Sequence, residues 1–377
     1  MDTKKEIAFL ITSTGWGGLE MNVLKLANLL TQKDYQIHLI SKKDSTIYQK
    51  RSENTFKGTF LLPDVKKYFD FKSAKKIANF LKEKGISKVI VFDNKDLDVT
   101  AWAKKLYYKK LKIIYQQQMQ IGINKKDLLH TFRFKTIDAW VTPLNYLKEE
   151  ISQRTKFPVE RVKIIPLSVD IYKFIERKYT KEEALKKLGI KPKSTLVGII
   201  GRISEKKGQL FLIESLIKLK EQGIDIELLI FGSPTVNDDD SKRYYEKILT
   251  VVKENNIEDS VHFVGHNDDI SLFYNAVDIF VLASHSETYG MVTVEALLSK
   301  VPVVATKSGG TSGLLNYGKF GQLYEFGNHN DFIEKLLFVI NNYEKAKETA
   351  EKAFVDAKKK YHLTQEADAF DDLLQNI

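Results

Sequence analysis

The sequence contains no cysteine, which excludes disulfides, thiolate nucleophiles and cysteine-based zinc sites. It has only 7 prolines and no low-complexity run, so nothing indicates a disordered or repetitive chain. No stretch approaches the roughly 18 apolar residues that a membrane-spanning helix needs. The apolar run at 7–11 is too short for the core of a signal peptide, and we interpret it as a first β-strand. We therefore expect a soluble, cytoplasmic protein.

Several catalytic patterns are missing as well. The sequence has no Gly-x-Ser-x-Gly elbow and no P-loop, so a hydrolase or kinase has no motif support. The seven histidines are scattered along the chain. Asp96 and Asp98 form an Asp-x-Asp pattern that some enzymes use to hold a divalent ion on a diphosphate, but helix capping explains it more simply. The acidic run 238–240 is interpreted as a solvated turn. We predict no metal and no bound cofactor.

Two successive series of short apolar runs and longer helical patterns fill the chain. Its 377 residues are about twice a usual domain length, so two domains are expected. Strands alternating with helices predict an α/β fold whose parallel sheets are covered on both faces. We place an N-terminal domain at 1–168, a C-terminal domain at 169–355, and a last helix at 356–377 that packs back on the first domain. The expected strands are 7–12, 36–41, 59–63, 88–93, 112–117 and 139–143, then 196–201, 227–232, 262–265, 279–284 and 302–306.

The net charge of +10 is unevenly distributed. Residues 1–170 carry 32 Lys/Arg against 18 Asp/Glu, a balance of +14, and residues 171–377 carry 27 against 31, a balance of −4. A basic first half predicts an anionic partner, which nucleic acid, lipid headgroups or a phosphorylated acceptor would satisfy. The absence of any nucleic-acid-binding motif argues against the first. Two lysine-rich, aromatic stretches, 66–76 and 102–112, are either solvated helix faces or a peripheral contact with the inner face of a membrane.

The strongest local motif is SHSETYGMVTVEALLSKVPVVATKSGG, residues 284–310. It follows an apolar strand and enters a helix near Gly290, whose unpaired N–H groups and partial positive charge would suit a diphosphate. Glu287 on the loop and Glu295 inside the helix could accept hydrogen bonds from sugar and ribose hydroxyls. The alternative is that Glu287 caps the helix and Glu295 lies on a solvated face.

A second motif, GRISEKKGQ at 201–209, follows the strand LVGIIG. Gly201 permits a close backbone approach, and Arg202 and Lys207 place two cations on a strand-to-helix loop. Two fixed cations could stabilise a diphosphate leaving group without a metal. Taken alone, such a loop is equally well explained as solvated surface.

The order of these motifs resembles the C-terminal domain of family 4 retaining glycosyltransferases with the GT-B fold, the group 1 type. The matching order is GR…KKG, IFGSP, HFVGH, SETYGMVTVEA and PVVAT…GG across about 196–325, and GWGGLE at 15–20 resembles the glycine loop after that family's first strand. The resemblance implies two Rossmann-like domains that face each other across a cleft.

The resemblance also implies roles for individual residues. Arg202 and Lys207 would contact the donor diphosphate, Glu287 would hold the transferred sugar, and Glu295 would bind the ribose hydroxyls. Gly17 and Gly18 would close over the phosphates from the opposite domain. The remaining donor-binding positions are Gly201, the nucleobase-side loop His266 and Asn267, and the segment Thr288, Tyr289, Gly290, Met291 and Val292.

The chain departs from the family pattern at two places. Where many relatives have a histidine, this sequence reads YQQQMQIG, so Gln118 and Gln120 are the acceptor-side candidates, and a glutamine cannot act as a titrating base. Where many relatives have a glutamate after the Gly-Gly pair, the position falls at Gly313. The implied reaction is retaining, metal-independent transfer from a UDP- or GDP-sugar to a hydroxyl of a glycan or lipid-linked acceptor, as in polysaccharide synthesis. Rival functions are a nucleotide-sugar epimerase, a phosphorylase and a non-catalytic nucleic-acid binder.

Overall fold

The computed structural model describes residues 5–51, 55–66, 68–176, 178–235 and 238–377. Lys67, part of the first lysine-rich stretch, lies outside them. The chain divides into two compact units, Met1–Val169 with Leu363–Ile377, and Asp170–His362. Among the described helices, none combines the length and the apolar character needed to cross a membrane.

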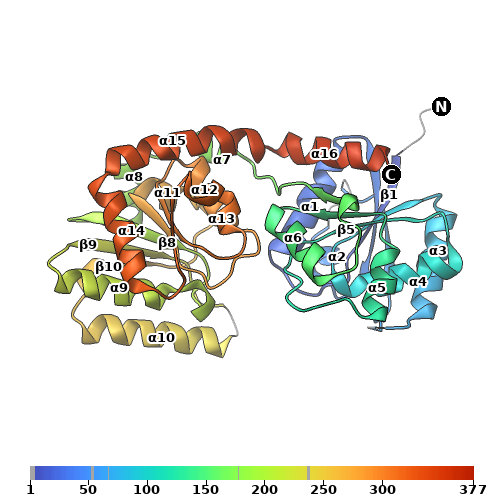
Figure 1. The fold of residues 1–377 in the computed structure, drawn as a ribbon, viewed down its shortest axis with the longest axis horizontal. Coiled ribbons are helices and arrows are strands. Elements are labelled where there is room, and N and C mark those ends of the chain that lie inside the picture. Colours follow the sequence, from blue (N-terminus) through green and yellow to red (C-terminus); the bar gives the residue numbers. More distant parts are fainter. Residues whose placement is uncertain (1–4, 52–54, 67, 177, 236–237) are drawn as a thin grey trace. The chain divides into compact units, whose positions relative to one another are not determined.

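The first unit is built on a seven-stranded sheet in the order β3-β2-β1-β4-β5-β6-β7, and the strand pairs are parallel (Figure 1). Such a sheet is buried on both faces, which is why its strands are nearly continuous apolar runs. The strands are β1 Lys5–Leu10, β2 Tyr35–Lys42, β3 Gly58–Leu62, β4 Lys88–Val91, β5 Lys112–Gln116, β6 Ala139–Thr142 and β7 Val162–Ile164. The helices are α1 Gly18–Thr31, α2 Thr46–Gln49, α3 Phe71–Glu83, α4 Leu97–Trp102, α5 Leu128–Lys135, α6 Asn145–Arg154 and α16 Leu363–Gln375.

The second unit has a six-stranded parallel sheet in the order β10-β9-β8-β11-β12-β13. Its strands are β8 Thr195–Ile200, β9 Ile226–Phe231, β10 Val261–Val264, β11 Ile279–Leu282, β12 Val303–Thr306 and β13 Gln322–Tyr324. Its helices are α7 Tyr172–Ile175, α8 Lys181–Leu188, α9 Gln209–Glu221, α10 Asp239–Glu254, α11 Ser271–Ala276, α12 Met291–Leu298, α13 Thr311–Leu314, α14 His329–Asn341 and α15 Tyr343–Lys360. Two parallel sheets covered by helices confirm the expected α/β fold class.

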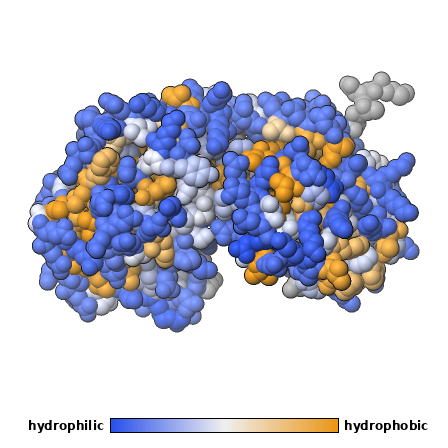
Figure 2. All heavy atoms as spheres, in the orientation of Figure 1, coloured by the Kyte–Doolittle hydropathy of each residue, from blue (hydrophilic) through white to orange (hydrophobic). Residues whose placement is uncertain are grey.

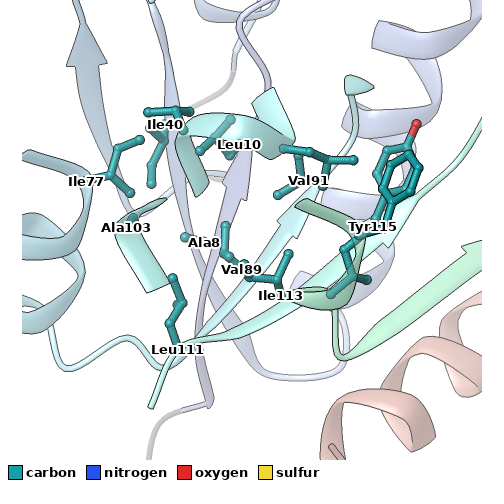
Figure 3. Close-up of a cluster of buried hydrophobic side chains, with 14 of the residues drawn as sticks. Ala8, Leu10, Ile40, Ile77, Val89, Val91, Ala103, Leu111, Ile113 and Tyr115 are labelled. Carbon is teal, nitrogen blue, oxygen red and sulfur yellow. The ribbon is translucent and has the colours of Figure 1, made fainter. Parts of the chain in front are cut away.

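Alternation along β1 shows how the first sheet is buried. Ala8 and Leu10 belong to the apolar cluster of one face, which Figure 3 shows with Ile77 of α3. Ile7 and Phe9 belong to the cluster of the opposite face, which α1 and α16 help to close. Successive side chains of a strand point to opposite faces, so a strand that is apolar throughout contributes side chains to the hydrophobic cores on both faces of the sheet.

Both sheets reverse their strand order at one point, between β1 and β4 in the first unit and between β8 and β11 in the second. Loops that follow the carboxyl ends of two such strands diverge to opposite sides and leave a crevice where open α/β sheets bind ligands. The motifs GWGGLE and GRISEKKGQ follow β1 and β8, and the motif around Glu287 follows β11. The topology therefore places each motif at a switch point of its own sheet.

Some elements differ from the expected ones. Within the lysine-rich stretch 102–112, the structure has no single regular helix: α4 ends at Trp102, and the chain continues as the π-helical segment η2, Ala103–Tyr107. The last expected segment began at 356, inside α15, whereas the chain enters the first unit at Leu363. There α16 packs on α1, and the buried carboxylate of Glu366 binds Lys25 at 2.8 Å and the backbone N–H of Ser168 at 3.0 Å.

A candidate donor site at the switch point of the second sheet

Lys207 and Glu287 meet across the switch point of the second sheet. Lys207 ends the 3₁₀ turn Glu205–Lys207 after β8, and Glu287 lies on the loop after β11. The Lys207 ammonium lies 2.5 Å from Glu287 Oε1, and the Ser284 hydroxyl donates to the same oxygen at 2.8 Å. The His285 N–H donates to the Lys206 carbonyl at 3.0 Å and ties the two loops together. The structure thus joins two motifs that the sequence presents 80 residues apart.

Two glycines allow this close packing of loops. Gly208 has a φ of +77°, and a Cβ there would stand 2.3 Å from the Ala283 carbonyl oxygen. Gly309 has a φ of +53°, and a Cβ there would stand 1.9 Å from the Glu287 carbonyl oxygen. The Gly310 N–H donates to that same oxygen at 2.8 Å. Neither Gly309 nor Gly310 was assigned a role from the sequence, although their pair ends the matching motif.

Helix α12 begins at this site without a side-chain cap. Its N-cap is Gly290, in the left-handed region with a φ of +91°, and Met291 and Val292 form the start of the first turn. The interpretation of Glu287 as a helix cap is therefore wrong. Tyr289 is buried and Thr288 is half-buried just before the helix. A helix start whose N-cap residue makes no side-chain capping bond can accept an anionic group.

Glu295 is half-buried and bound to Tyr274 of α11. The Tyr274 hydroxyl lies 2.8 Å from Glu295 Oε2 and 3.0 Å from the Val292 carbonyl oxygen. Burial raises the pKa of the Glu295 carboxyl, and the hydrogen bond from Tyr274 partly opposes that shift. The interpretation of Glu295 as a solvated face residue is therefore wrong. No sequence motif points to Tyr274, because it lies 21 residues upstream on a separate helix.

Arg202 lies at the end of β8 beside Gly201, and its side chain is exposed. In the part of the chain that the structure describes, no carboxylate forms an ion pair with its guanidinium. Gly201 has a φ of +138°, and its carbonyl oxygen would be 2.0 Å from a Cβ on Gly232. A backbone crossing this tight fixes where the loop after β8 starts.

The loop after β10 carries the two nucleobase-side candidates. The His266 N–H donates to the Ser233 hydroxyl at 2.8 Å, which links this loop to the end of β9. The Asn267 side-chain oxygen accepts the Asp269 N–H at 2.9 Å, so it shapes its own turn. The fixed backbone is compatible with the expected contact through main-chain atoms.

In the first unit, the glycine loop is held by Glu20. The Gly17 N–H donates to Glu20 Oε2 at 2.9 Å, and the Ser13 hydroxyl donates to Oε1 at 2.6 Å. Gly17 is the N-cap of α1, and no atom lies within 4 Å of where a Cβ on Gly18 would stand. The Glu20 carboxylate thereby orders the loop, and Gly17 and Gly18 add no side chain of their own at the start of α1.

The glutamines after β5 divide into two groups. Gln117 is buried, accepts the Trp140 indole N–H at 2.9 Å and serves the core. Gln118 accepts from the Asn22 amide at 3.1 Å, while its own side-chain nitrogen is buried without a partner in the described structure. Gln120 is exposed and lies 3.3 Å from the Tyr146 hydroxyl. Gln118 and Gln120 thus remain the pair that could bind an acceptor.

Asp96 occupies the N-cap position of α4, but its carboxylate makes no capping hydrogen bond, so the expectation that this side chain caps the helix is wrong. Its carboxylate is buried and accepts the Thr12 N–H at 2.9 Å and the Thr12 hydroxyl at 2.6 Å, across the switch point of the first sheet. Burial raises its pKa to about 7, against the opposing effect of these hydrogen bonds. Asp98 accepts the Phe69 N–H at 3.1 Å, so the two carboxylates serve different partners. Within the described residues, no group of three or more His, Asp or Glu is arranged to hold a metal.

Comparison with known proteins agrees with this geometry. Residues 180–356 match the family model Glycosyl transferases group 1. A trehalose synthase from Thermococcus litoralis is 27% identical over 237 residues, which are 62% of this chain and only 56% of that protein. The chain thus spans about half the length of that relative.

Two further proteins align along nearly the whole chain. The Campylobacter jejuni N-acetylgalactosamine-N,N'-diacetylbacillosaminyl-diphospho-undecaprenol 4-alpha-N-acetylgalactosaminyltransferase is 24% identical over 94% of this chain and 95% of its own. The crystal structure of Anabaena HepE in complex with UDP superposes with a TM-score of 0.83 at 19% identity, over 99% of this chain and 100% of that one. The resemblance inferred from the motifs is confirmed: the chain has the GT-B fold, and its residues 180–356 match the model of the family Glycosyl transferases group 1.

Proposed function

We propose that the protein is a glycosyltransferase that moves a sugar from a nucleoside-diphosphate sugar to a hydroxyl of a glycan or lipid-linked acceptor. The observation that carries the proposal is the junction of Lys207 and Glu287 beside the uncapped start of α12. A cation and open amide groups suit a pyrophosphate, and a carboxylate suits sugar hydroxyls. UDP is the first nucleotide to test, because the HepE crystal structure contains it; GDP is the second.

The proposed reaction retains the anomeric configuration and needs no metal. The acceptor oxygen bonds to the anomeric carbon on the face from which the nucleotide leaves, as the bond from that carbon to the phosphate oxygen breaks. The acceptor proton passes to the departing phosphate. Arg202, Lys207 and the α12 amide groups stabilise the charge that develops on the diphosphate. Glu287 orients the sugar, and Glu295 binds the ribose hydroxyls.

Polysaccharide or glycolipid synthesis at the cytoplasmic side of a membrane is the setting that we propose. The Campylobacter relative is named for a diphospho-undecaprenol substrate. A second relative, from Streptococcus pneumoniae, is named alpha-monoglucosyldiacylglycerol synthase and is 32% identical over 52% of this chain. Both names point to lipid-bearing acceptors, and neither identifies the acceptor of this chain.

Nucleotide binding is the direct test. UDP, GDP, ADP and CMP are added separately and thermal unfolding is measured. A ligand at about 100 times its Kd adds roughly 2.7 kcal/mol to the free energy of unfolding. The preferred nucleotide is then supplied as its sugar, and slow release of free sugar is followed without an acceptor. If no nucleotide shifts unfolding, the transferase proposal fails.

The rivals predict different products. An epimerase would convert the nucleotide sugar to its isomer without releasing nucleotide, and a phosphorylase would need inorganic phosphate. A nucleic-acid binder would retain RNA or DNA with an affinity that falls steeply with salt. Separating nucleotide, free sugar, sugar phosphate and isomeric nucleotide sugar by chromatography therefore distinguishes the enzymatic alternatives, and a salt-titrated binding assay tests the nucleic-acid binder.

A further inference from the structure

Four aromatic side chains from three segments meet on the surface of the first unit. Trp102, at the end of α4, contacts Phe71 of α3 with ring centroids 5.0 Å apart, Phe69 at 6.0 Å and Phe132 of α5 at 4.6 Å. Phe69 and Phe71 are 51% and 41% exposed, although apolar rings of this size gain free energy from burial. Figure 2 shows hydrophobic surface in this region, at the α4–α5 end of the unit.

Exposed leucines extend the aromatic cluster. Leu106 follows Trp102 by one turn and is 52% exposed. Leu128 and Leu129 precede Phe132 by one turn of α5 and are 86% and 46% exposed. Residues three and four apart share a helix face, so these side chains continue the apolar area of Trp102 and Phe132. A contiguous apolar area on a protein surface marks a contact with a partner or a membrane.

Lysines surround this apolar area. The segments that build it, 66–76, 102–112 and 125–135, carry 14 Lys/Arg and only 2 Asp. Of these two, Asp70 accepts the Ser73 N–H at the start of α3, and Asp127 pairs with His130. We name the aromatic–lysine surface by its residues Phe69, Phe71, Trp102, Leu106, Leu128, Leu129 and Phe132, with Lys72, Lys75, Lys105 and Lys135.

The structure refines what the sequence suggested about the stretch 102–112. Lys104 binds Asp138 at 2.5 Å and the Thr136 carbonyl at 2.9 Å, and Lys112 lies 3.7 Å from Asp138, so these two are not free cations. Trp102, Tyr107 and Tyr108 pack partly against the core. The exposed lysines that share helix faces with the apolar side chains lie instead at Lys72, Lys75, Lys105 and Lys135, for which the described structure has no carboxylate partner.

We propose that the aromatic–lysine surface docks on a lipid bilayer that carries anionic headgroups. Exposed rings and leucines would enter the interface, and each lysine near the anionic surface adds electrostatic attraction. A bilayer fits better than nucleic acid, because phosphate-backbone binding would not need Leu128 almost fully exposed. Docking itself does not require the transferase activity; only its use in reaching a lipid-linked acceptor rests on the proposed function.

Vesicle binding tests the proposal with the full chain and without any nucleotide. The vesicles are phosphatidylcholine alone, or phosphatidylcholine with phosphatidylglycerol, and binding is measured by co-sedimentation at low and high salt. We expect binding to the anionic vesicles that weakens with salt. Fluorescence gives a second readout: in a Trp16→Phe background, Trp102 emission shifts to the blue on binding, whereas buried Trp140 does not respond.

Two sets of variants locate the surface. Phe69→Ser with Phe71→Ser and Leu128→Ser should reduce anionic-vesicle binding about tenfold or more, and so should Lys72→Glu with Lys105→Glu and Lys135→Glu. The matched controls lie in the second unit and should bind as the unchanged protein does. They are the apolar set Leu249→Ser, Phe338→Ser and Val355→Ser, and the lysine set Lys218→Glu, Lys247→Glu and Lys253→Glu.

Circular dichroism and thermal unfolding, measured on every variant without nucleotide, show that each one is folded. The proposal is overturned if the unchanged protein does not bind anionic vesicles, or if both sets on the surface bind as well as their controls. Binding to RNA in place of vesicles would overturn it too. Any of these results leaves the nucleotide-binding test unaffected, so the two proposals fail separately.

Discussion

At the scale of single residues, the Lys207–Glu287 pair gives the sharpest test of the proposed site. Replacing Lys207 by Ala removes one cation from the diphosphate and leaves the half-buried Glu287 without its partner. We expect turnover to fall roughly 10²–10³-fold, as when one oxyanion donor is removed. Arg202→Ala should lower turnover by a similar factor. It should not disturb Glu287, because no described carboxylate forms an ion pair with Arg202. The measurement is steady-state transfer or donor hydrolysis.

The control for this pair is Lys206→Ala, whose exposed side chain has no described partner, although its carbonyl binds His285. Turnover of that variant should stay within a few-fold of the unchanged protein. Near-normal activity of both Lys207→Ala and Arg202→Ala would refute the assignment of the diphosphate site.

Asp96 predicts a pH dependence of stability. Its pKa is raised by burial from the ordinary 3.8 to about 7, so the folded state holds a proton that the unfolded state releases. The resulting stabilisation is fully present below pH 3.8 and is lost as pH rises to about 7, at about 1.4 kcal/mol per pH unit at most. Asp96→Asn keeps the shape and cannot ionise.

Chemical denaturation of the two proteins between pH 4 and 8 checks this. The free energy of unfolding of Asp96→Asn, relative to the unchanged protein, should increase across that range and level off above pH 7. A difference that does not change with pH would show that Asp96 ionises normally in the folded state. Asp64, which is almost fully exposed, is the control position, and Asp64→Asn should give no such trend there.

The roles of residues that lie within a local sequence motif could be predicted, and the roles of residues that depend on contacts with distant segments could not. Arg202, Lys207 and Glu287 were found because each follows an apolar strand within a motif. Tyr274, which holds Glu295, was missed because nothing near it in the sequence indicates that contact. Asp96 was assigned to capping because its position at a helix start hides its bond to Thr12, 84 residues away.

At the scale of elements, the site depends on loops that pack closer than a side chain permits. Gly208→Ala would place a Cβ 2.3 Å from the Ala283 carbonyl oxygen and would also strain a φ of +77°. The loop that carries Lys207 must then move away from β11. We expect a loss of stability of more than about 1 kcal/mol, the ordinary cost of a left-handed alanine, together with weaker nucleotide binding.

Gly189 offers the matched control. It has a φ of +70° at the end of α8, and no atom lies within 4 Å of where its Cβ would stand. Gly189→Ala should therefore lower stability through backbone strain alone, without a steric clash, and should leave nucleotide binding unchanged. Equal losses of stability in the two variants, by thermal unfolding, would mean that the contact with Ala283 does not matter.

Long apolar strands and amphipathic helices could be predicted, and short or charged elements could not. The apolar sequence runs that form β8, β9 and β11 are nearly continuous, because both faces of those strands are buried. The strands β7 and β13 have only 3 residues each, too few to show a pattern. Helix α8 is KEEALKKL, with a single buried residue, so its apolar period is hardly visible. Its capping box, Thr180 with Glu183, was the available signal.

At the scale of the whole molecule, the C-terminal segment packs on the same unit as the N-terminal part of the chain. Leu363–Ile377 belongs to the first unit, and Asp371 of α16 binds Lys5 at 3.1 Å and Tyr35 at 2.8 Å. Sequence could suggest a final helix that packs back, but not where the second unit ends, because α15 and α16 follow each other as charged helices with little between them. The contacts of the buried Glu366 are what mark the return.

The core of the first unit is therefore completed by the last residues of the chain. Phe370 is fully buried in the cluster with Phe9 and Leu26, and Phe370→Ala should destabilise the first unit by about 3–5 kcal/mol. Phe338→Ala in the second unit, where that ring is 47% exposed, should cost far less. Because the proposed nucleotide contacts lie mostly in the second unit, Phe370→Ala should lower the unfolding temperature of the first unit while UDP still stabilises the second. Calorimetry with and without UDP resolves the two transitions, and a uniform shift of both would show that the units do not unfold as separate bodies.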